Sequence, residues 1–341
     1  MNHAGQPKIL IIVDRPGWAH DHKTGNLQRV LSDKYEIIKK YQSEVSEVDL
    51  QQANLIQVYY WLQVQRLPHL AQAFDQNSSK LLVGVCSHIE LENDLFEPAL
   101  VQLGKANAVF VNNLLLYQEL EPLLNTPVLY TPNGVDTNFF SPRTIKYRSD
   151  NMRVGWSGSL SNRVPGYRGL ENFIVPAIQA MKGVELVTAI REEHWRSHKE
   201  MIDFYHSLDV YICASVTEGT PNTCLEAAAC GIPVVTTRVG NMPELIKPGI
   251  NGYFIERDIA DIVRVLTILR DNEGHTSQLG QAIRASVLDW DWTSRAENYD
   301  HLYQVSLASL RGRSSKVLLK LGNRWNEFRK KIRRVYTDLA R

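Results

Sequence analysis

Two acidic residues, Glu218 and Glu226, lie eight positions apart in a segment rich in small and hydroxyl-bearing residues. A carboxylate accepts two hydrogen bonds, so it suits vicinal hydroxyls such as those of a ribose. The positions after Glu218 are occupied by Gly219, Thr220, Pro221, Asn222 and Thr223. We therefore interpret this segment as a candidate site for a nucleotide or a sugar.

The pattern around these residues predicts a strand, a turn and a helix. An apolar run ends near Ser215, and Gly219 marks the turn. Pro221 suits the first helical position, because the N–H group that proline lacks has no partner there. Gly231 suits the left-handed residue that ends a helix. Such a turn directs backbone N–H groups toward a bound phosphate or sugar hydroxyl.

Strands that position this turn are predicted along most of the chain, because short apolar runs alternate with segments of helical spacing. This alternation is typical of parallel sheets covered on both faces. The predicted strands are 8–13, 35–40, 55–60, 80–86, 108–112 and 128–131, followed by 153–156, 184–189, 210–214, 233–237 and 252–255. A turn-rich stretch, 131–150, separates the two series and is predicted to link two domains.

Several further motifs accompany the acidic segment. They are G-I-P-V-V-T-T-R-V-G-N-M-P-E-L-I from Gly231, G-I-N-G from Gly249, N-G-V-D-T-N-F-F-S-P from Asn133, S-L-D-V-Y-I from Ser207 and D-W-T from Asp291. Together with the two glutamates, these motifs resemble the retaining glycosyltransferases of family 4, also called group 1. The resemblance covers roughly residues 8–308 and is strongest from Asn133 onward.

The resemblance implies an α/β protein with the GT-B fold, in which two Rossmann-like, doubly wound domains face a central cleft. Ligands of such sheets bind beside the carboxyl ends of the strands. The implied boundaries are an acceptor domain at 1–135, a linker at 136–150, a nucleotide-sugar domain at 151–292, a closing helix at 293–310 that returns toward the first domain, and a basic amphipathic tail at 311–341.

The resemblance also implies a reaction. A hexosyl-type sugar would be transferred from a nucleotide diphosphate to an acceptor hydroxyl, with retention of configuration at the anomeric carbon. Glu226 would hold the ribose of the donor. Glu218 and the segment 219–223 would orient the transferred sugar. Preorganised donors would stabilise the departing diphosphate, whose charge develops as the glycosidic bond breaks.

Relatives hold the diphosphate with two basic side chains and no metal. The first of these positions holds Ser159 in this chain, which departs from the pattern, and the second holds Arg168. Arg163 is either a substitute for the missing partner or a solvated loop arginine. Arg168 is therefore the predicted catalytic cation, with Ser159 and Arg163 as further donor-binding candidates.

Two residues of the first domain match positions that the family uses. Gly17 lies in the loop after the first strand, where a glycine allows close backbone approach to a ligand. His88 matches a histidine that points at the transferred sugar in many relatives. A lone histidine also has a structural interpretation, and both remain open for His88.

Two clusters that suggest a metal are interpreted otherwise. His20, Asp21 and His22 are consecutive on a predicted helix and therefore point in different directions. Asp289 and Asp291 form a D-x-D sequence, but tryptophans flank it at the start of a predicted helix, so capping and packing explain it better. We expect no metal and no cofactor, the nucleotide sugar being a substrate.

Two alternatives to the transferase keep the nucleotide-sugar site. One is a sugar-nucleotide epimerase of the same fold. The other is a non-catalytic nucleotide-sugar binding protein with a basic interaction tail. Turnover that depends on Glu226 distinguishes the transferase from a binding protein.

The last 31 residues carry eleven Lys and Arg residues against Glu327 and Asp338. Their apolar residues follow helical spacing and form one face: Val317, Leu321, Trp325, Phe328, Ile332, Val335 and Leu339. An amphipathic helix with a cationic flank suits an anionic membrane surface. Packing on the acidic body or on another subunit and, less favoured, nucleic-acid binding are the alternatives.

No secretion signal or membrane-spanning run is recognised in the chain. The four cysteines form no C-x-x-C pair, which favours reduced thiols. We therefore expect a cytoplasmic protein, peripheral on the inner face of the membrane if the tail binds lipid. The acceptor would then be lipid-linked or a growing surface polysaccharide.

Overall fold

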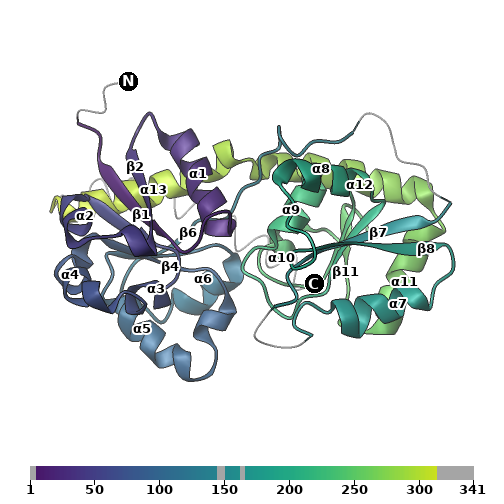
Figure 1. Cartoon of the computed structure of the whole chain (residues 1–341), viewed down its shortest axis with the longest axis horizontal. Coiled ribbons are helices and arrows are strands. Elements are labelled where there is room, and N and C mark those ends of the chain that lie inside the picture. The colour runs from purple at the N-terminus through teal and green to yellow at the C-terminus, as the bar shows by residue number, and fades with distance from the viewer. Residues whose placement is uncertain (1–4, 144–149, 162–165, 313–341) are drawn as a thin grey trace. The chain divides into compact units, whose positions relative to one another are not determined.

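The computed structural model describes residues 5–143, 150–161 and 166–312. Arg163 and the basic tail from residue 313 lie outside the described residues. The chain forms two compact units (Figure 1). Among the described residues, unit 1 comprises 5–133 and 292–312, and unit 2 comprises 134–143, 150–161 and 166–291.

Unit 1 contains a parallel sheet with the strand order β2-β1-β3-β4-β5-β6. Its strands are β1 Lys8–Val13, β2 Glu36–Tyr41, β3 Leu55–Val58, β4 Leu81–Val85, β5 Ala108–Val111 and β6 Val128–Tyr130. Its α-helices are α1 Ala19–Leu31, α2 Glu47–Gln52, α3 Leu62–Gln65, α4 Ala71–Gln76, α5 Phe96–Gly104, α6 Leu114–Leu120 and α13 Trp292–Leu310.

Apart from the half-buried edge strand β2, this sheet is buried on both faces, because successive strand residues point to opposite faces and nearly all are apolar. Ile9 and Ile11 pack with side chains of α1 and α13. Leu10 and Ile12 pack on the other face with side chains of α2 to α6. The apolar runs therefore form the centre of a three-layer unit.

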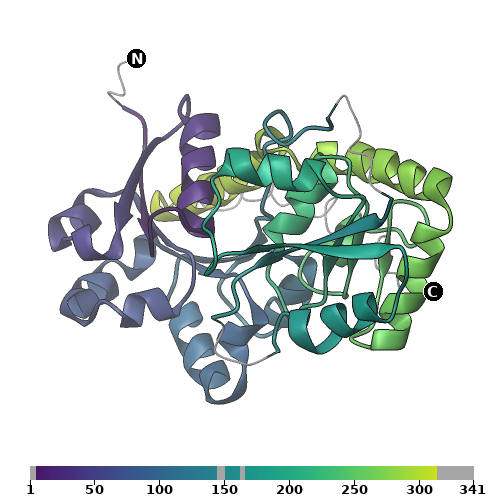
Figure 2. The same cartoon turned by 45° about the vertical axis from the view of Figure 1, so that its right-hand side comes forward.

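Unit 2 repeats this architecture with the parallel strand order β11-β10-β9-β7-β8. Its strands are β7 Met152–Gly158, β8 Val184–Ile190, β9 Val210–Cys213, β10 Val234–Thr236 and β11 Gly252–Phe254. Its α-helices are α7 Val175–Gln179, α8 His198–His206, α9 Asn222–Ala229, α10 Met242–Leu245, α11 Ile259–Arg270 and α12 Glu273–Val287. Helices lie above and below the sheet (Figure 2).

Each predicted strand is present, with ends within two residues of the prediction. The two doubly wound α/β units are thus confirmed. The start of the predicted linker belongs to the core of unit 2, since Phe140 is buried and Arg284 donates hydrogen bonds to the carbonyl oxygens of Thr137 and Phe140.

Helix α13 follows unit 2 in the sequence but packs in unit 1. The hydroxyl of Tyr299 donates to the carbonyl oxygen of Thr131 at 3.0 Å. The hydroxyl of Tyr303 donates to Oε1 of Gln57 on β3 at 2.8 Å. Because these groups are buried, unit 1 needs the helix to complete its core. Within the described ranges, no helix is both long and apolar enough to cross a membrane.

One side chain of α13 tests this packing. Asp300 accepts a hydrogen bond from the buried Tyr35 hydroxyl at 2.7 Å and pairs with Lys34. We predict that Asp300→Ala lowers the free energy of unfolding of unit 1 by about 1–3 kcal/mol, because the Tyr35 hydroxyl loses its acceptor. Urea unfolding measures the change. The exposed Glu297 on the same helix provides the control, Glu297→Ala, and equal stability of the two variants would contradict the prediction.

Candidate functional site

The acidic loop, residues 215–221, connects β9 to α9 in unit 2. Pro221 precedes the helix and has ψ 85°, so the helix begins at Asn222, one residue later than predicted. The prediction for Pro221 was therefore wrong by one position, because this ψ value lies outside the helical range. Gly231 has φ +75° and follows the helix in the predicted left-handed conformation.

Neighbouring segments hold the acidic loop in place. The hydroxyl of Thr237 donates to the carbonyl oxygen of Ser215 at 2.8 Å, and that of Tyr167 donates to the carbonyl oxygen of Thr217 at 2.6 Å. Gly240 has φ +54°, and a Cβ atom there would collide with the carbonyl oxygen of Gly219. Only glycine fits this position without strain, so the loop conformation depends on residues far along the chain.

Glu218 contacts the predicted cation directly. Nη1 of Arg168 and the hydroxyl of Ser215 donate hydrogen bonds to Oε1 of Glu218 at 3.1 and 2.9 Å. Arg168 reaches this point because Gly169, with φ +72°, packs its backbone against Ala214 at the end of β9. The structure thus brings together Glu218, predicted to orient the transferred sugar, and Arg168, the predicted catalytic cation.

Glu226 lies on the second turn of α9 and faces α8. The hydroxyl of Tyr205 donates a hydrogen bond to Oε2 of Glu226 at 2.7 Å. Burial raises the pKa of Glu226 to about 7, although the Tyr205 hydrogen bond opposes the shift. A carboxyl group with this pKa binds hydrogen-bond donors strongly once it is ionised.

Several polar atoms near the acidic loop are buried without a hydrogen-bond partner among the described residues. They are Nε of Arg168, Oγ1 of Thr220, and Oδ1 and Nδ2 of Asn241. Arg168 contacts Glu218, Thr220 belongs to the loop, and Asn241 follows the Gly240 that packs against it. Buried polar groups without partners are rare in folded proteins. Such atoms also occur elsewhere in both units, but these four adjoin Glu218 and the acidic loop, where a ligand that supplies both donors and acceptors would satisfy them.

Glu192, which follows β8, contacts the loop that follows β7. Glu192 accepts hydrogen bonds from the Ser159 hydroxyl and from the N–H groups of Leu160 and Ser161, the last two at 3.0 and 3.2 Å. The Ser159 hydrogen bond, followed by that of Leu160, lowers the pKa of Glu192. This loop starts beside Arg168, whose Cδ lies against Gly158.

Glu192 was not predicted from the sequence. Strands β7 and β8 pair in parallel with Gly158 opposite Ile190, which places the next residues of both strands side by side. The pairing register is therefore the signal that locates Glu192, and it becomes visible only once the two strands are aligned.

The predicted residues of unit 1 have partners of their own. Gly17 has φ +69°, and its N–H group donates to Oδ2 of Asp21 at 2.8 Å. His88 begins a short 3₁₀ helix, and its Nε2 lies 3.2 Å from Oε2 of Glu119. Both belong to a different unit from the acidic loop, so their roles toward a donor stay predictions.

The two apparent metal clusters have other partners. Asp21 pairs with Lys39, His20 contacts Asp14, and His22 is exposed. Among the described residues, no group of three or more His, Cys, Asp or Glu side chains is placed to hold a metal ion. Oδ2 of Asp291 accepts hydrogen bonds from the N–H and hydroxyl groups of Thr137, at 3.0 and 2.8 Å.

Comparisons with known proteins point to one family. Residues 156–272 match the family model described as "Glycosyl transferases group 1". A D-inositol 3-phosphate glycosyltransferase from Arthrobacter sp. is 33% identical over 178 residues, which is 49% of this chain and 42% of that protein. The same-named protein from Streptomyces coelicolor is 28% identical over 116 residues, 34% of this chain and 25% of that protein. The chain thus spans about a quarter to two fifths of these relatives.

Solved structures resemble nearly the whole chain. Sucrose-phosphate synthase from Thermosynechococcus elongatus aligns with a TM-score of 0.73 at 14% identity, covering 89% of this chain and 100% of that chain. Anabaena HepE in complex with UDP and glucose aligns with a TM-score of 0.70 at 13% identity, covering 88% and 100%. These likenesses confirm the predicted GT-B fold.

The raised pKa of Glu226 makes stability depend on pH. The folded state holds a proton on this carboxyl up to about pH 7, whereas an unfolded glutamate loses it near pH 4.3. The cost of the buried charge therefore grows as the pH rises from about 4.3 to 7 and is complete above 7. We predict that the melting temperature of Glu226→Gln lies roughly 2–4 °C above that of the wild type at pH 8, which is the shift that about 1 kcal/mol produces. Near pH 4 the two proteins should melt at the same temperature.

Differential scanning calorimetry at both pH values measures this difference. Glu256→Gln, at an exposed glutamate of unit 2, is the matched control and should show no gain. A pH-independent difference for Glu226→Gln would show that the carboxyl is not protonated in the folded protein.

Proposed function

We propose that this chain transfers a sugar from a nucleotide diphosphate to an acceptor hydroxyl, with retention of configuration at the anomeric carbon. The match of residues 156–272 to the group 1 glycosyl transferases supports this proposal. The observation that carries the proposal is the group of unpartnered buried polar atoms around the acidic loop, next to Glu218 and Arg168. The structures of HepE with UDP and with UDP-glucose make UDP-glucose the first donor to test.

The ribose of the donor is assigned to Glu226. Its carboxylate accepts two hydrogen bonds, one from each of two vicinal hydroxyls, while Tyr205 holds Oε2. Binding of these hydroxyls stabilises the ionised carboxylate and therefore lowers its pKa. Donor binding and deprotonation of Glu226 are coupled in this proposal.

The diphosphate is assigned to Arg168 and Thr220. Nε of Arg168 and the hydroxyl of Thr220 are buried donors without protein partners among the described residues. Glu218 holds one end of the guanidinium and orients the transferred sugar with its remaining oxygen. A fixed cation at this point stabilises the charge that develops on the leaving diphosphate.

The reaction breaks the bond between the anomeric carbon and the diphosphate oxygen. The acceptor oxygen forms the new bond to the anomeric carbon on the same face of the sugar. The acceptor proton passes to the departing phosphate oxygen, so the products are a glycoside and a nucleoside diphosphate. No protein nucleophile takes part, which agrees with the engagement of Glu218 by Arg168 and Ser215.

A second candidate function is binding of the nucleotide sugar without turnover. The carboxylate of Glu192 favours it, because this charge binds the loop in which the family pattern has a cation. Nucleotide binding without release of nucleoside diphosphate, across a broad panel of donors and acceptors, would support this alternative.

The acceptor is assigned to unit 1, with Gly17 and His88 as candidate contacts. We further propose a lipid-linked or surface-polysaccharide acceptor and contact of the basic tail with anionic membranes, on the basis of the tail's sequence. Co-sedimentation with anionic vesicles, with and without residues 312–341, tests the membrane contact. Equal binding by both forms would contradict it.

Turnover provides the main test of the proposed site. We predict that Arg168→Gln lowers kcat/KM for UDP-glucose by about 10²–10³, the usual cost of removing one preorganised donor. Release of UDP in the presence of an acceptor panel measures the rate. Arg264→Gln is the control, because Arg264 is an exposed arginine of unit 2 paired with Asp261. Unchanged activity of Arg168→Gln would exclude the assigned role.

The carboxylate beside the diphosphate site generates a separate prediction. Glu192→Gln should tighten UDP binding about twofold to fivefold at low salt, because it removes an exposed like charge. The gain should disappear at high salt, where exposed charges are screened. Isothermal titration calorimetry at two ionic strengths measures it, and Glu193→Gln is the neighbouring control. Weaker UDP binding by Glu192→Gln would show that the carboxylate holds the loop in its binding conformation.

A further inference from the structure

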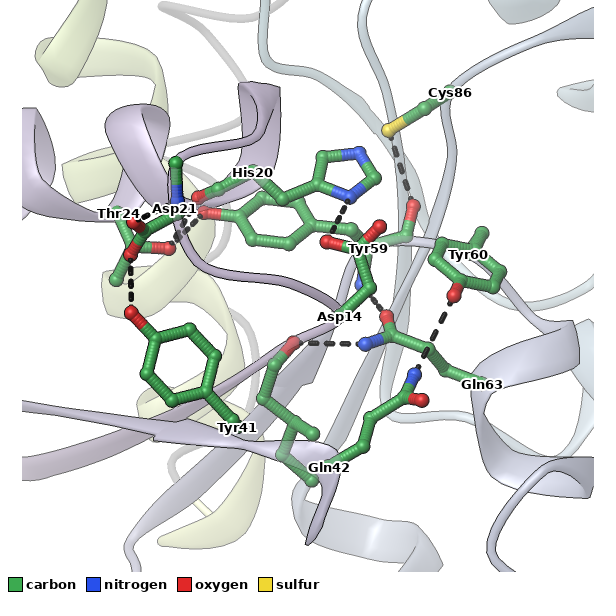
Figure 3. Close-up of polar contacts among 12 residues, drawn as sticks. Asp14, His20, Asp21, Thr24, Tyr41, Gln42, Tyr59, Tyr60, Gln63 and Cys86 are labelled. Atoms are coloured by element: carbon green, nitrogen blue, oxygen red, sulfur yellow. Dashed lines mark hydrogen bonds and ion pairs between the residues drawn. The ribbon is translucent and has the colours of Figure 1, made fainter. Parts of the chain in front are cut away.

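A polar cluster of unit 1 lies where β1 and β3 end (Figure 3). Asp14 follows β1, Tyr59 and Tyr60 follow β3, and His20 lies in the first turn of α1. The His20 ring stacks on that of Tyr59, with centroids 4.4 Å apart and planes 10° apart, and lies 5.8 Å from the ring of Tyr60. We call these four residues the histidine cluster.

Asp14 lies beside the imidazole, and its Oδ1 has no other partner in hydrogen-bond geometry among the described residues. Its Oδ1 lies 3.3 Å from Nδ1 of His20, and both side chains are about one fifth exposed, at 21% each. Burial lowers the pKa of His20, although Asp14 opposes this shift. Burial opposes ionisation of Asp14, but the His20 contact and backbone hydrogen bonds together lower the pKa of Asp14.

The imidazole is therefore neutral and the carboxylate ionised near pH 7. The nearby carboxylate favours the tautomer with the proton on Nδ1, which leaves a lone pair on Nε2. Nε2 has no hydrogen-bond partner among the described residues. The arrangement presents a hydrogen-bond acceptor held at a fixed angle.

Hydrogen bonds hold Tyr59, on whose ring the His20 ring stacks. The side chain of Gln63 accepts from the N–H group of Tyr59 at 2.7 Å and donates to the carbonyl oxygen of Ile12 at 3.0 Å. The hydroxyls of Tyr59 and Thr24 are 2.8 Å apart, and the ammonium group of Lys23 lies 4.9 Å above the Tyr59 ring. A group held this firmly loses little entropy when it binds a ligand.

The surroundings of the cluster suit a ring that carries hydroxyls. Tyr60 is partly exposed, and its hydroxyl accepts a hydrogen bond from Nη1 of Arg66 at 2.8 Å. Trp18 caps the same turn of α1 that carries His20 and is 39% exposed. The guanidinium groups of Arg15 and Arg66 lie over the rings of Trp18 and Tyr60, 4.9 and 5.2 Å from the ring centroids, and cover part of each ring. The exposed parts of the two rings, beside a hydrogen-bond acceptor, offer both an apolar and a polar contact.

We infer that the histidine cluster is a subsite for a neutral polyhydroxylated ring of the acceptor, a monosaccharide or a cyclitol. This inference rests on the proposed function, because it concerns the acceptor of that transfer. Nε2 of His20 accepts a hydrogen bond from a hydroxyl that does not react, so no proton is transferred to it. Asp14 acts through His20 and is a positioning residue.

Nuclear magnetic resonance of the full-length protein tests the subsite, with glucose and myo-inositol as probes. Adding at least one of them should move the ¹⁵N resonance of His20 Nε2 and leave that of the exposed His22 unmoved. The indole resonance of Trp18 provides a second reporter, which remains available in variants of His20.

The variants separate a binding role from a structural role. His20→Ala should weaken probe binding about threefold to tenfold, the loss of one hydrogen bond. His20→Gln retains an acceptor oxygen and should recover most of the affinity. Asp14→Asn should weaken binding and change the tautomer reported by the His20 ¹⁵N shifts. His22→Ala, on the same helix, should bind as the wild type does.

Two results would overturn the subsite. One is the absence of any shift at His20 with either probe, and the other is unchanged probe affinity in His20→Ala. The probe titrations are run without UDP. A negative result in them therefore bears on the subsite alone, and UDP binding by unit 2 tests the proposed function separately. Loss of UDP binding alone would contradict the proposed function and leave the ring subsite standing.

Discussion

The central constraint in unit 2 is the carboxyl group of Glu226, which lies largely buried and accepts a hydrogen bond from the hydroxyl of Tyr205. Burial raises its pKa to about 7, so its charged form costs folding free energy near neutral pH. Helices α8 and α9 carry the two partners, and the apolar core behind them fixes their spacing. A group whose charged form destabilises the fold is typical of a binding site, since a ligand can supply hydrogen bonds that the protein itself does not make.

The parallel sheets determine which residues meet. In each unit the loops that follow the strands gather at one edge, because all the strands run in the same direction. In unit 2 this edge brings Arg168 to Glu218 and Glu192 to Ser159. In unit 1 the same rule brings Asp14 to His20 and the two tyrosines after β3. Two edges with different chemistry therefore arise from one architecture. That of unit 2 carries the carboxylates of Glu218 and Glu192 beside Arg168, and that of unit 1 carries aromatic rings beside an imidazole.

Local patterns predicted the strands, the turn after β9 and the glycine that ends α9, because each depends on residues close in sequence. Pro221 was misplaced by one residue, since its ψ angle depends on the packing of the acidic loop against Gly240. The contact of Glu192 with Ser159 was missed because it depends on the register of β7 and β8. His20 was considered only as a metal ligand. Its contact with Asp14 depends on how α1 packs over the end of β1, and the spacing of residues within either segment does not predict this packing.

A crystal structure of the full-length protein with bound UDP tests the central claim most directly. The account predicts that both ribose hydroxyls donate to the carboxylate of Glu226, and that the diphosphate lies within hydrogen-bond distance of Arg168 and Thr220. UDP bound elsewhere, with Glu226 still paired only to Tyr205, would contradict it.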